Sequence, residues 1–419
     1  MNPLTSNAGM ISAPGGARLY RALIERMLAP MKLGQLHVTT PEGQRLVYGG
    51  ADPAPRAGIR INNPAFYRKC VLYGDIGLGE AYVDGDWDTD DIVAVISWFV
   101  HNLENAPAVT GSARRFSFGN FLKLFNRLRH LARVNNHGGS RRHIREHYDL
   151  SNDFFRQFLD PGMTYSSAWF SEPGEDLETA QAEKYDRLCR RLQLQATDDV
   201  LEIGSGWGGF AMHAARRFGC RVHSITVSEA QLTYARARIA AAGLADRVTF
   251  ELRDYRDIEG SYDKIVSIEM LEAVGHRFLR PYFQACQRAL KRDGLLGLQV
   301  ITYPDARYDD YRRGVDWVQK HIFPGGLLPS IDAMQQAIRA TGDLQLHHLE
   351  QMGLHYAETL AQWRQRLNRN PAAITELGFD ALFLRKWNYY LCYCEAAFRM
   401  RNITVIQAIY TRPNNMRAE

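Results

Sequence analysis

Short apolar segments alternate with helical patterns through the second half of this chain. Strands and helices that alternate at this spacing form parallel βαβ units, which assemble into one twisted sheet with helices on both faces. We therefore predict an α/β fold of the Rossmann-like, doubly wound, mostly parallel type. The predicted strands cover 199–203, 221–226, 247–252, 264–268 and 294–301, the predicted helices cover 209–218, 229–242 and 280–290, and 344–349 and 403–410 are expected to add antiparallel edge strands.

The first 137 residues follow a different pattern, which predicts a smaller α+β domain. Prolines and asparagines interrupt its middle between Pro53 and Pro64, and a polar stretch with two glycines at 134–140 is typical of a linker. The sequence thus predicts an N-terminal lipid-docking or accessory domain at 1–137 and a second domain at 138–419. A lid insertion is expected at about 304–338 of the second domain.

The composition is that of a folded protein, with 46% hydrophobic and 23% charged residues, which excludes disordered and collagen-like classes. The N-terminus shows no charged region followed by an apolar run, and no stretch of about eighteen apolar residues occurs, so neither a signal peptide nor a membrane span is expected. The six cysteines are scattered without metal or redox spacing. This predicts a reduced, cytoplasmic protein with no metal site.

The net charge is +5, and the positive charge is distributed unevenly. The segment 105–145 holds nine arginines and lysines and no acidic residue. Apolar residues recur there at helical spacing, from Phe121 to Ala132. A basic helix with one apolar face favours the surface of an anionic bilayer, at the inner face of the membrane. A solvated linker helix fits the same pattern almost as well. Nucleic acid is not expected as a partner, because no recognition module accompanies the charge. The basic residues are Arg114, Arg115, Lys123, Arg127, Arg129, Arg133, Arg141, Arg142 and Arg145.

A glycine-rich turn follows the first predicted strand of the second domain. Gly204, Gly206 and Gly209 satisfy the dinucleotide pattern G-x-G-x-x-G, which by itself is a weak signal. Glu202 precedes the first glycine, in the E-x-G-x-G arrangement typical of class I methyltransferases, and this favours S-adenosylmethionine as the ligand. Glu229 lies about twenty residues further on and would suit the ribose of a dinucleotide, so both ligands remain open on the turn alone.

The wider sequence resembles one family, the cyclopropane fatty acid synthases and mycolic acid methyltransferases. The resemblance runs in order from about Pro64 to Pro413. It implies a class I methyltransferase that uses S-adenosylmethionine. The matching segments are 78–87, 147–155, 159–161, 163–167, 181–184, 226–231, 253–257, 269–275, 321–326 and 388–399.

The resemblance also implies contacts to the cofactor and a reaction. In this family a methyl group is transferred to a carbon–carbon double bond of a lipid acyl chain, and ring closure then gives a cyclopropane fatty acid. The implied substrate is an unsaturated acyl chain, held on phospholipid at the membrane surface. The implied cofactor contacts are Tyr165, Ser166, Gly204, Ser205, Gly206, Thr226, Val227, Ser228, Glu229, Ala230, Gln231, Asp254 and Tyr255.

The resemblance further implies a bound bicarbonate ion that removes a proton from the added methyl group. Its ligands would be Glu272, Tyr356, the backbone of Ile301, Ser167 where the family has cysteine, and Gln299 where it has histidine. Serine and glutamine can hydrogen-bond an anion, but glutamine cannot relay a proton near neutral pH. A branched methyl or methylene product is therefore an alternative to the ring. Cys394 matches a position regarded as catalytic in the family, although its apolar helical surroundings favour a packing role.

The sequence leaves two alternative functions open. A methyltransferase for small molecules would use the same turn beside a short polar pocket. A non-catalytic lipid-binding homologue would keep the fold without the reaction. The N-terminal domain would dock lipid or a second copy of the chain, which would make a homodimer.

Overall fold

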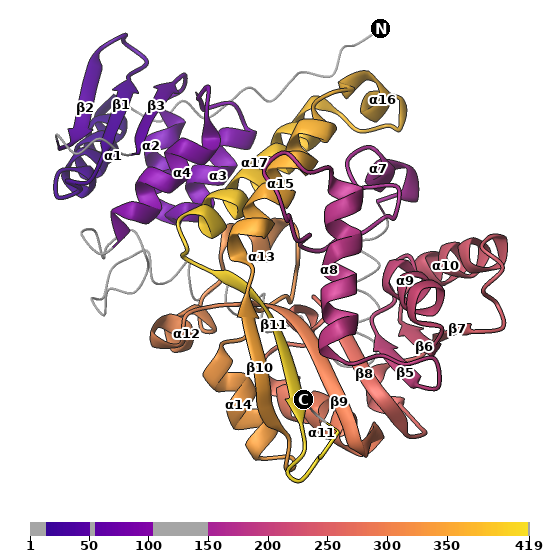
Figure 1. Ribbon diagram of the computed structural model, residues 1–419. Helices are drawn as coiled ribbons and strands as arrows, with labels where there is room; N and C mark the ends of the chain where they lie inside the picture. Colours follow the sequence, from indigo (N-terminus) through magenta and orange to yellow (C-terminus); the bar gives the residue numbers. More distant parts are fainter. Residues whose placement is uncertain (1–13, 51–54, 104–149, 418–419) are drawn as a thin grey trace, which may run out of the picture. The chain divides into compact units, whose positions relative to one another are not determined.

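The computed structural model describes residues 14–50, 55–103 and 150–417. The chain divides into two compact units, 1–124 and 125–419 (Figure 1). The boundary of both the observed units and the predicted domains lies outside the described residues, as does the basic segment 105–145. In the described ranges, no helix is long and apolar enough to cross a membrane.

In its described residues, the N-terminal unit combines a small sheet with four helices, in agreement with the predicted α+β fold. Its strands are ordered β2-β1-β3-β4, with β1 and β3 parallel and the other pairs antiparallel. Trp87 and Trp98 are fully buried in its core, and the indole N–H of Trp87 donates to the backbone oxygen of Leu78 at 2.9 Å. The elements are α1 (Pro14–Leu28), β1 (Gln35–Thr39), β2 (Arg45–Gly49), β3 (Arg56–Ile61), α2 (Ala65–Tyr73), α3 (Asp75–Val83), β4 (Trp87–Asp88) and α4 (Ile92–His101).

The C-terminal unit is built on a seven-stranded sheet ordered β10-β11-β9-β8-β5-β6-β7. The five strands from β9 to β7 are parallel, and β11 pairs antiparallel with both β9 and β10. This confirms the predicted doubly wound, mostly parallel sheet. Its strands are β5 (Asp199–Ile203), β6 (Arg221–Thr226), β7 (Val248–Leu252), β8 (Tyr262–Ile268), β9 (Leu290–Thr302), β10 (Gln345–Gln351) and β11 (Thr404–Thr411).

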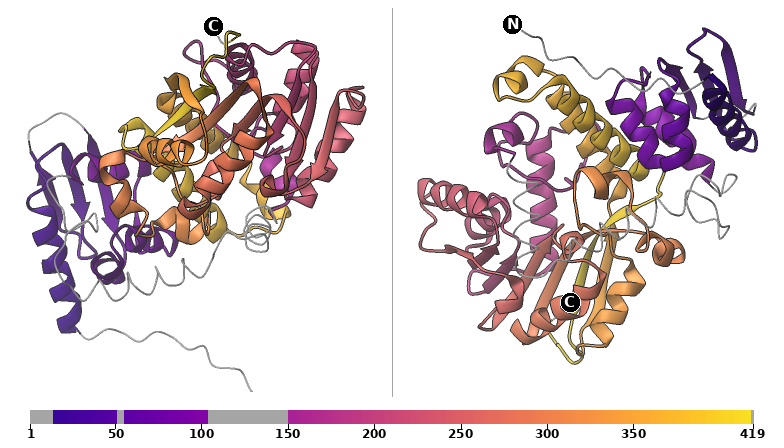
Figure 2. Two further views of the ribbon diagram at one scale, coloured as in Figure 1. Left: turned by 90° about the horizontal axis from the view of Figure 1, so that it is seen from below. Right: turned by 180° about the vertical axis from the view of Figure 1, so that it is seen from behind.

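Helices cover both faces of this sheet (Figures 1 and 2). Neighbouring residues of a strand point to opposite sides, so Val200 packs with residues of α8, α9 and α10, whereas Leu201 packs with residues of α11 and α14 on the other face. The strand order reverses between β5 and β8, and ligands of open α/β sheets bind outside the carboxyl ends of the strands at such a point. The helices are α7 (Asn152–Arg156), α8 (Leu177–Arg191), α9 (Gly209–Phe218), α10 (Glu229–Ala241), α11 (Leu279–Ala289), α14 (Ile331–Arg339), α15 (Gly353–Leu367), α16 (Pro371–Glu376) and α17 (Ala381–Arg399).

Two details differ from the sequence prediction. The strand expected at 403–410 is not an edge strand, since β11 lies between β9 and β10. Of the two expected edge strands, only β10 lies at an edge of the sheet. The expected lid segment holds α12 (Asp305–Tyr311), α13 (Trp317–His321) and α14. Met334 and Ile338 of α14 are buried in the core beside α11. The end of the segment therefore supports the sheet, and the lid remains a prediction for the part before α14.

Candidate active site

The glycine turn lies at the carboxyl end of β5, where the strand order reverses. Gly204, Gly206 and Gly208 have φ angles of 96°, 49° and 86°, which glycine adopts far more readily than other residues. A Cβ atom at Gly206 would meet no protein atom within 4 Å, so the backbone is open to a ligand there. Gly209 instead packs against α8, where a Cβ would lie 2.8 Å from the Tyr185 hydroxyl.

A second turn, between β6 and α10, lies at the same edge of the sheet. Ser228 caps α10 by accepting from the backbone N–H of Gln231 at 3.3 Å, and Thr226 Oγ1 accepts from the backbone N–H of Ser228 at 3.1 Å. Thr226 Oγ1 also donates to Gln231 Oε1 at 3.2 Å. These bonds hold the predicted cofactor segment in one conformation. Within it, Val227 is half-buried and both Glu229 and Ala230 are exposed.

Asp254 and Tyr255 follow β7 at the next strand end. Arg256 donates to both carboxylate oxygens of Asp254, at 2.8 Å from Nε and 2.6 Å from Nη2. The Tyr255 ring packs against Tyr282 with 5.4 Å between centroids. An adenine amino group bound by Asp254 would therefore share the carboxylate with Arg256.

Helix α8 supports the loop that carries Tyr165, Ser166 and Ser167. Gln181 Nε2 donates to the backbone oxygen of Ser166 at 2.9 Å, and Lys184 Nζ donates to Ser166 Oγ at 2.7 Å. Lys184 is fully buried. Desolvation lowers the pKa of Lys184 to about 7, against the opposing effect of the nearby carboxylates, of which Glu269 is the strongest.

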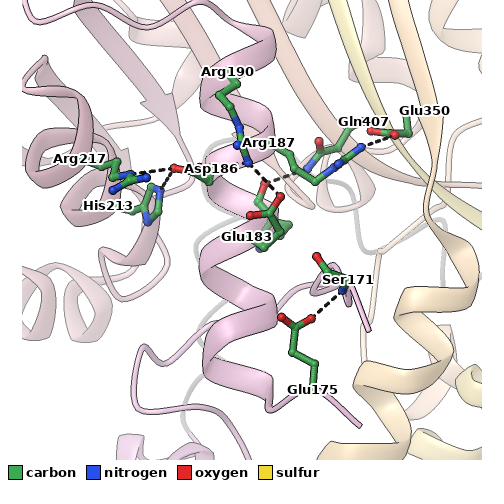
Figure 3. Close-up of polar contacts among 11 residues, drawn as sticks. Ser171, Glu175, Glu183, Asp186, Arg187, Arg190, His213, Arg217, Glu350 and Gln407 are labelled. Atoms are coloured by element: carbon green, nitrogen blue, oxygen red, sulfur yellow. Dashed lines mark hydrogen bonds and ion pairs between the residues drawn. The ribbon is translucent and has the colours of Figure 1, made fainter. Parts of the chain in front are cut away.

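Several polar contacts hold α8 in place (Figure 3). Asp186 lies 3.2 Å from His213 and 3.5 Å from Arg217, both on α9. Gln407 of β11 donates to the backbone oxygen of Lys184 at 3.3 Å. The loop at Ser166 is thus connected to both α9 and β11 through one rigid helix.

Glu269, directly after β8, is the centre of the polar network. Its Oε1 accepts from the backbone N–H of Ser167 and from Gln299 Nε2, both at 2.8 Å. Tyr356 interacts with the same carboxylate through a side-chain hydrogen bond that lowers the pKa of Glu269. Desolvation acts in the opposite direction and raises that pKa overall. Gln299 is itself oriented by Gln407, which donates to its Oε1 at 3.0 Å.

Glu272 lies one turn further along the chain. Its Oε1 accepts from the backbone N–H of Ile301, and its Oε2 is a buried oxygen without a hydrogen-bond partner in the described residues. Desolvation, and then repulsion by Glu269, raise the pKa of Glu272 to about 8. The pair therefore favours an ionised Glu269 beside a protonated Glu272.

These contacts bear on the expected bicarbonate ion. The four predicted donor groups are those of Ser167, Gln299, Tyr356 and Ile301, and each already faces a carboxylate of the chain. The residues present therefore do not fit a bicarbonate ion in the arrangement that the sequence led us to expect.

A wall of aromatic rings leads from the glycine turn to these carboxylates. Trp207 of the turn lies 5.0 Å from Phe155, Phe155 lies 5.3 Å from Tyr165, and Tyr165 lies 5.2 Å from Trp363, measured between ring centroids. Trp363 is 6.1 Å from Tyr356. Aromatic faces attract cations, so this wall suits a sulfonium group or a carbocation.

Comparison with known proteins identifies the chain. The family model for mycolic acid cyclopropane synthetase matches residues 136–408. The chain belongs to the mycolic acid cyclopropane synthetase family. It is 38% identical to a tuberculostearic acid methyltransferase from Mycobacterium tuberculosis, over 87% of this chain and 86% of the relative. It is 34% identical to a cyclopropane-fatty-acyl-phospholipid synthase from Escherichia coli, over 85% and 88%. A solved mycolic acid cyclopropane synthase in complex with SAH (S-adenosylhomocysteine) and CTAB is 30% identical and covers 67% of this chain and 99% of its own, with a TM-score of 0.60.

Membership of this family settles two expectations. The chain is an S-adenosylmethionine-dependent methyltransferase, and S-adenosylmethionine is its cofactor. The dinucleotide and the non-catalytic alternatives are thereby excluded. The open backbone at Gly206 fits such a cofactor, because a close approach of ligand to backbone requires a residue without a side chain.

The structure brings together most of the predicted site residues, and it adds others that the sequence reasoning missed. Glu269, Lys184 and Gln407 were not predicted as site residues. The local signal for Glu269, a charged residue directly after a buried strand, is a common one. Cys394 lies on α17 and is partly buried. Desolvation raises the pKa of its thiol, which keeps the thiol neutral and argues against a nucleophile.

Proposed function

We propose that this protein transfers a methyl group to the carbon–carbon double bond of an unsaturated fatty acyl chain of a phospholipid. One observation carries the proposal, the juxtaposition of the glycine turn, the aromatic wall and the carboxylates Glu269 and Glu272. The named activities of the relatives from M. tuberculosis and E. coli support an acyl-chain substrate.

The site residues would contribute in distinct ways. S-adenosylmethionine, when bound, supplies an electrophilic methyl group. The two turns at 204–206 and 226–231 would hold the cofactor, and the Tyr165–Ser166 loop would close over it. An alkene is a weak nucleophile, so its alignment and the exclusion of water must contribute much of the rate. The faces of Tyr165, Trp363 and Tyr356 would stabilise the carbocation that methyl addition leaves on the chain.

We propose a cyclopropane as the product. Loss of one proton from the added methyl closes the ring, because the electron pair of that C–H bond forms the new C–C bond. A methylene branch is the second candidate, since the relative from M. tuberculosis is named as a tuberculostearic acid methyltransferase and not as a cyclopropane synthase. It arises when a hydride first shifts along the chain and the same methyl then loses its proton to form a double bond. A saturated methyl branch would need a reductant in a later reaction.

We also propose a membrane-facing organisation. The predicted basic segment 105–145 and the N-terminal domain would bring the enzyme to an anionic bilayer surface from the cytoplasmic side. The segment between β9 and α14 would form part of a lid over the acyl channel. These proposals rest on sequence pattern, and vesicle sedimentation at low and high salt would test the first of them.

One labelling experiment tests the reaction. The enzyme is incubated with S-adenosylmethionine bearing a trideuterated methyl group and with vesicles of dioleoylphosphatidylglycerol, and the acyl chains are analysed by mass spectrometry and NMR. We expect chains that keep two of the three deuteriums, with cyclopropane signals for ring closure or vinylidene carbon signals for the methylene product. Cofactor binding without label in any acyl chain would refute the proposal and would favour a small polar acceptor.

A further inference from the structure

We propose that the Glu269 carboxylate occupies the anion position of this active site and is itself the base that receives the proton from the transferred methyl group. The proposal rests on the proposed acyl-chain reaction for the origin of that proton. It assigns to a side chain of the protein the role that the sequence resemblance gave to a bicarbonate ion.

The hydrogen-bond donors carry the first step of the reasoning. The backbone N–H of Ser167 and the side-chain amide of Gln299 both point at one oxygen of Glu269, at 2.8 Å each. Tyr356 interacts with the same carboxylate. These three groups were expected to bind the bicarbonate ion. They converge instead on the Glu269 carboxylate, which therefore marks the position of the anion.

The backbone of Glu269 supplies an independent observation. Its φ angle is 48°, a left-handed conformation that costs a residue with a side chain roughly 1–2 kcal/mol. Strain of this kind is typical of functional positions, where the surrounding structure holds the residue in place. Here the strained conformation directs the carboxylate of Glu269 toward Ser167 and Gln299, while a hydrogen bond of 2.7 Å from its backbone N–H to the oxygen of Gln299 holds the main chain.

Burial raises the pKa of Glu269 overall, which suits a group that must accept a proton. The hydrogen bond from Gln299, on β9, and the charge of Lys184, on α8, act against burial and favour the ionised form. Glu272 is the other acidic group close to it, and its raised pKa keeps it protonated and uncharged near neutral pH. Glu269 is half-buried as a residue, and its carboxylate lies beside Ser167, Gln299 and Tyr356.

The proposed step balances without any additional reactant. One C–H bond of the added methyl breaks, and its electron pair forms the C–C bond of the ring or the double bond of the methylene branch. The proton binds to the carboxylate of Glu269 and is released to water after the product leaves. Both products thus use the same base.

Two variants of Glu269 test the proposal. Glu269→Gly removes the carboxylate and relieves the backbone strain, so the variant should fold. Glu269→Gln fills the same space without a basic group. We expect both to lose at least roughly 100-fold in turnover on dioleoylphosphatidylglycerol vesicles in buffer free of carbon dioxide, the usual contribution of a general base. Added bicarbonate or formate should restore part of the activity of Glu269→Gly in a saturable manner, and none of that of Glu269→Gln.

The wild-type enzyme and a matched control complete the experiment. Wild-type turnover should not change when bicarbonate is removed or added. Glu251→Ala, which removes a glutamate paired with Arg253 and His223 on β7, should behave as the wild type does. A wild-type rate that falls in buffer free of carbon dioxide, or an active Glu269→Gly in that buffer, would overturn the proposal.

A binding measurement separates this proposal from the proposed function. Carbon-13 NMR of labelled bicarbonate should show binding to Glu269→Gly but not to the wild type or to Glu269→Gln, whatever the methyl acceptor is. Bicarbonate that binds the wild type as tightly as the glycine variant would refute the assignment of the anion position. If lipid methylation fails while this binding pattern appears, only the acyl substrate is wrong.

Discussion

Gly206→Ala isolates the contact between the glycine turn and the cofactor. A Cβ at position 206 would meet no protein atom within 4 Å, so the substitution adds no clash inside the protein. Gly243, at the C-terminal end of α10, offers a matched control, because its φ angle of 67° is also left-handed and its Cβ would also be unobstructed. Each alanine should lower the free energy of unfolding by roughly 1–2 kcal/mol through backbone strain alone.

Cofactor affinity should separate the two variants. The added methyl at position 206 would occupy the space where the ligand approaches the backbone, and overpacking of this size costs about 2 kcal/mol, or roughly 30-fold in affinity. Urea denaturation measures the first effect, and calorimetric titration with S-adenosylhomocysteine measures the second. We expect equal loss of stability and a loss of affinity in Gly206→Ala only. Equal affinities in the two variants would show that the cofactor does not approach Gly206.

Three further predictions follow from the titratable groups of the site. The pKa of Glu272 is raised from its usual 4.5 to about 8, so the stability that it contributes is present below pH 4.5 and is lost as the pH rises to 8, by at most roughly 5 kcal/mol. Glu272→Gln should therefore gain stability relative to the wild type across this range in denaturation at stepped pH, and parallel stability curves would contradict the assignment. Cys394→Ala should keep turnover close to that of the wild type, because the thiol is neutral. A loss of more than about tenfold would show that Cys394 has a catalytic role. Lys184→Met should weaken cofactor binding several-fold, because Ser166 loses its hydrogen bond to Lys184. The circular dichroism of the variant should be unchanged. Lys69→Met, which removes a lysine paired with Asp84 and Asp86 in the other unit, should leave the cofactor affinity unaltered.

The fold of the C-terminal unit was predictable because its signals are local. Strands β5 and β6 begin and end where the apolar runs at 199–203 and 221–226 do, and the glycine turn follows from residues adjacent in sequence. The order of strands is not local. Ile403 to Tyr410 shows an apolar segment and nothing about its neighbours, so the insertion of β11 between β9 and β10 could not be deduced.

The same limit applies to the active site. Ser167, Gln299 and Glu269 lie on three separate segments, and only the parallel pairing of β8 with β9 brings the last two within 2.8 Å. A glutamate after a buried strand is an ordinary feature of a sequence. Its function appears only when the donors that surround it are known.

Ser167 and Gln299 stand where the family has cysteine and histidine, and their roles become clear only together with Glu269. A histidine beside a bound anion can relay a proton, whereas in the proposed site a carboxylate of the chain itself accepts the proton. The site then needs a neutral donor to hold the carboxylate in place, and the amide of Gln299 is such a donor. Because ring closure and the methylene branch both remove a proton from the same carbon, the base does not select between them. In the proposed reaction, the selection would depend on whether a hydride shifts before the proton leaves. It would therefore depend on how closely the aromatic wall from Phe155 to Tyr356 confines the acyl chain beside Glu269.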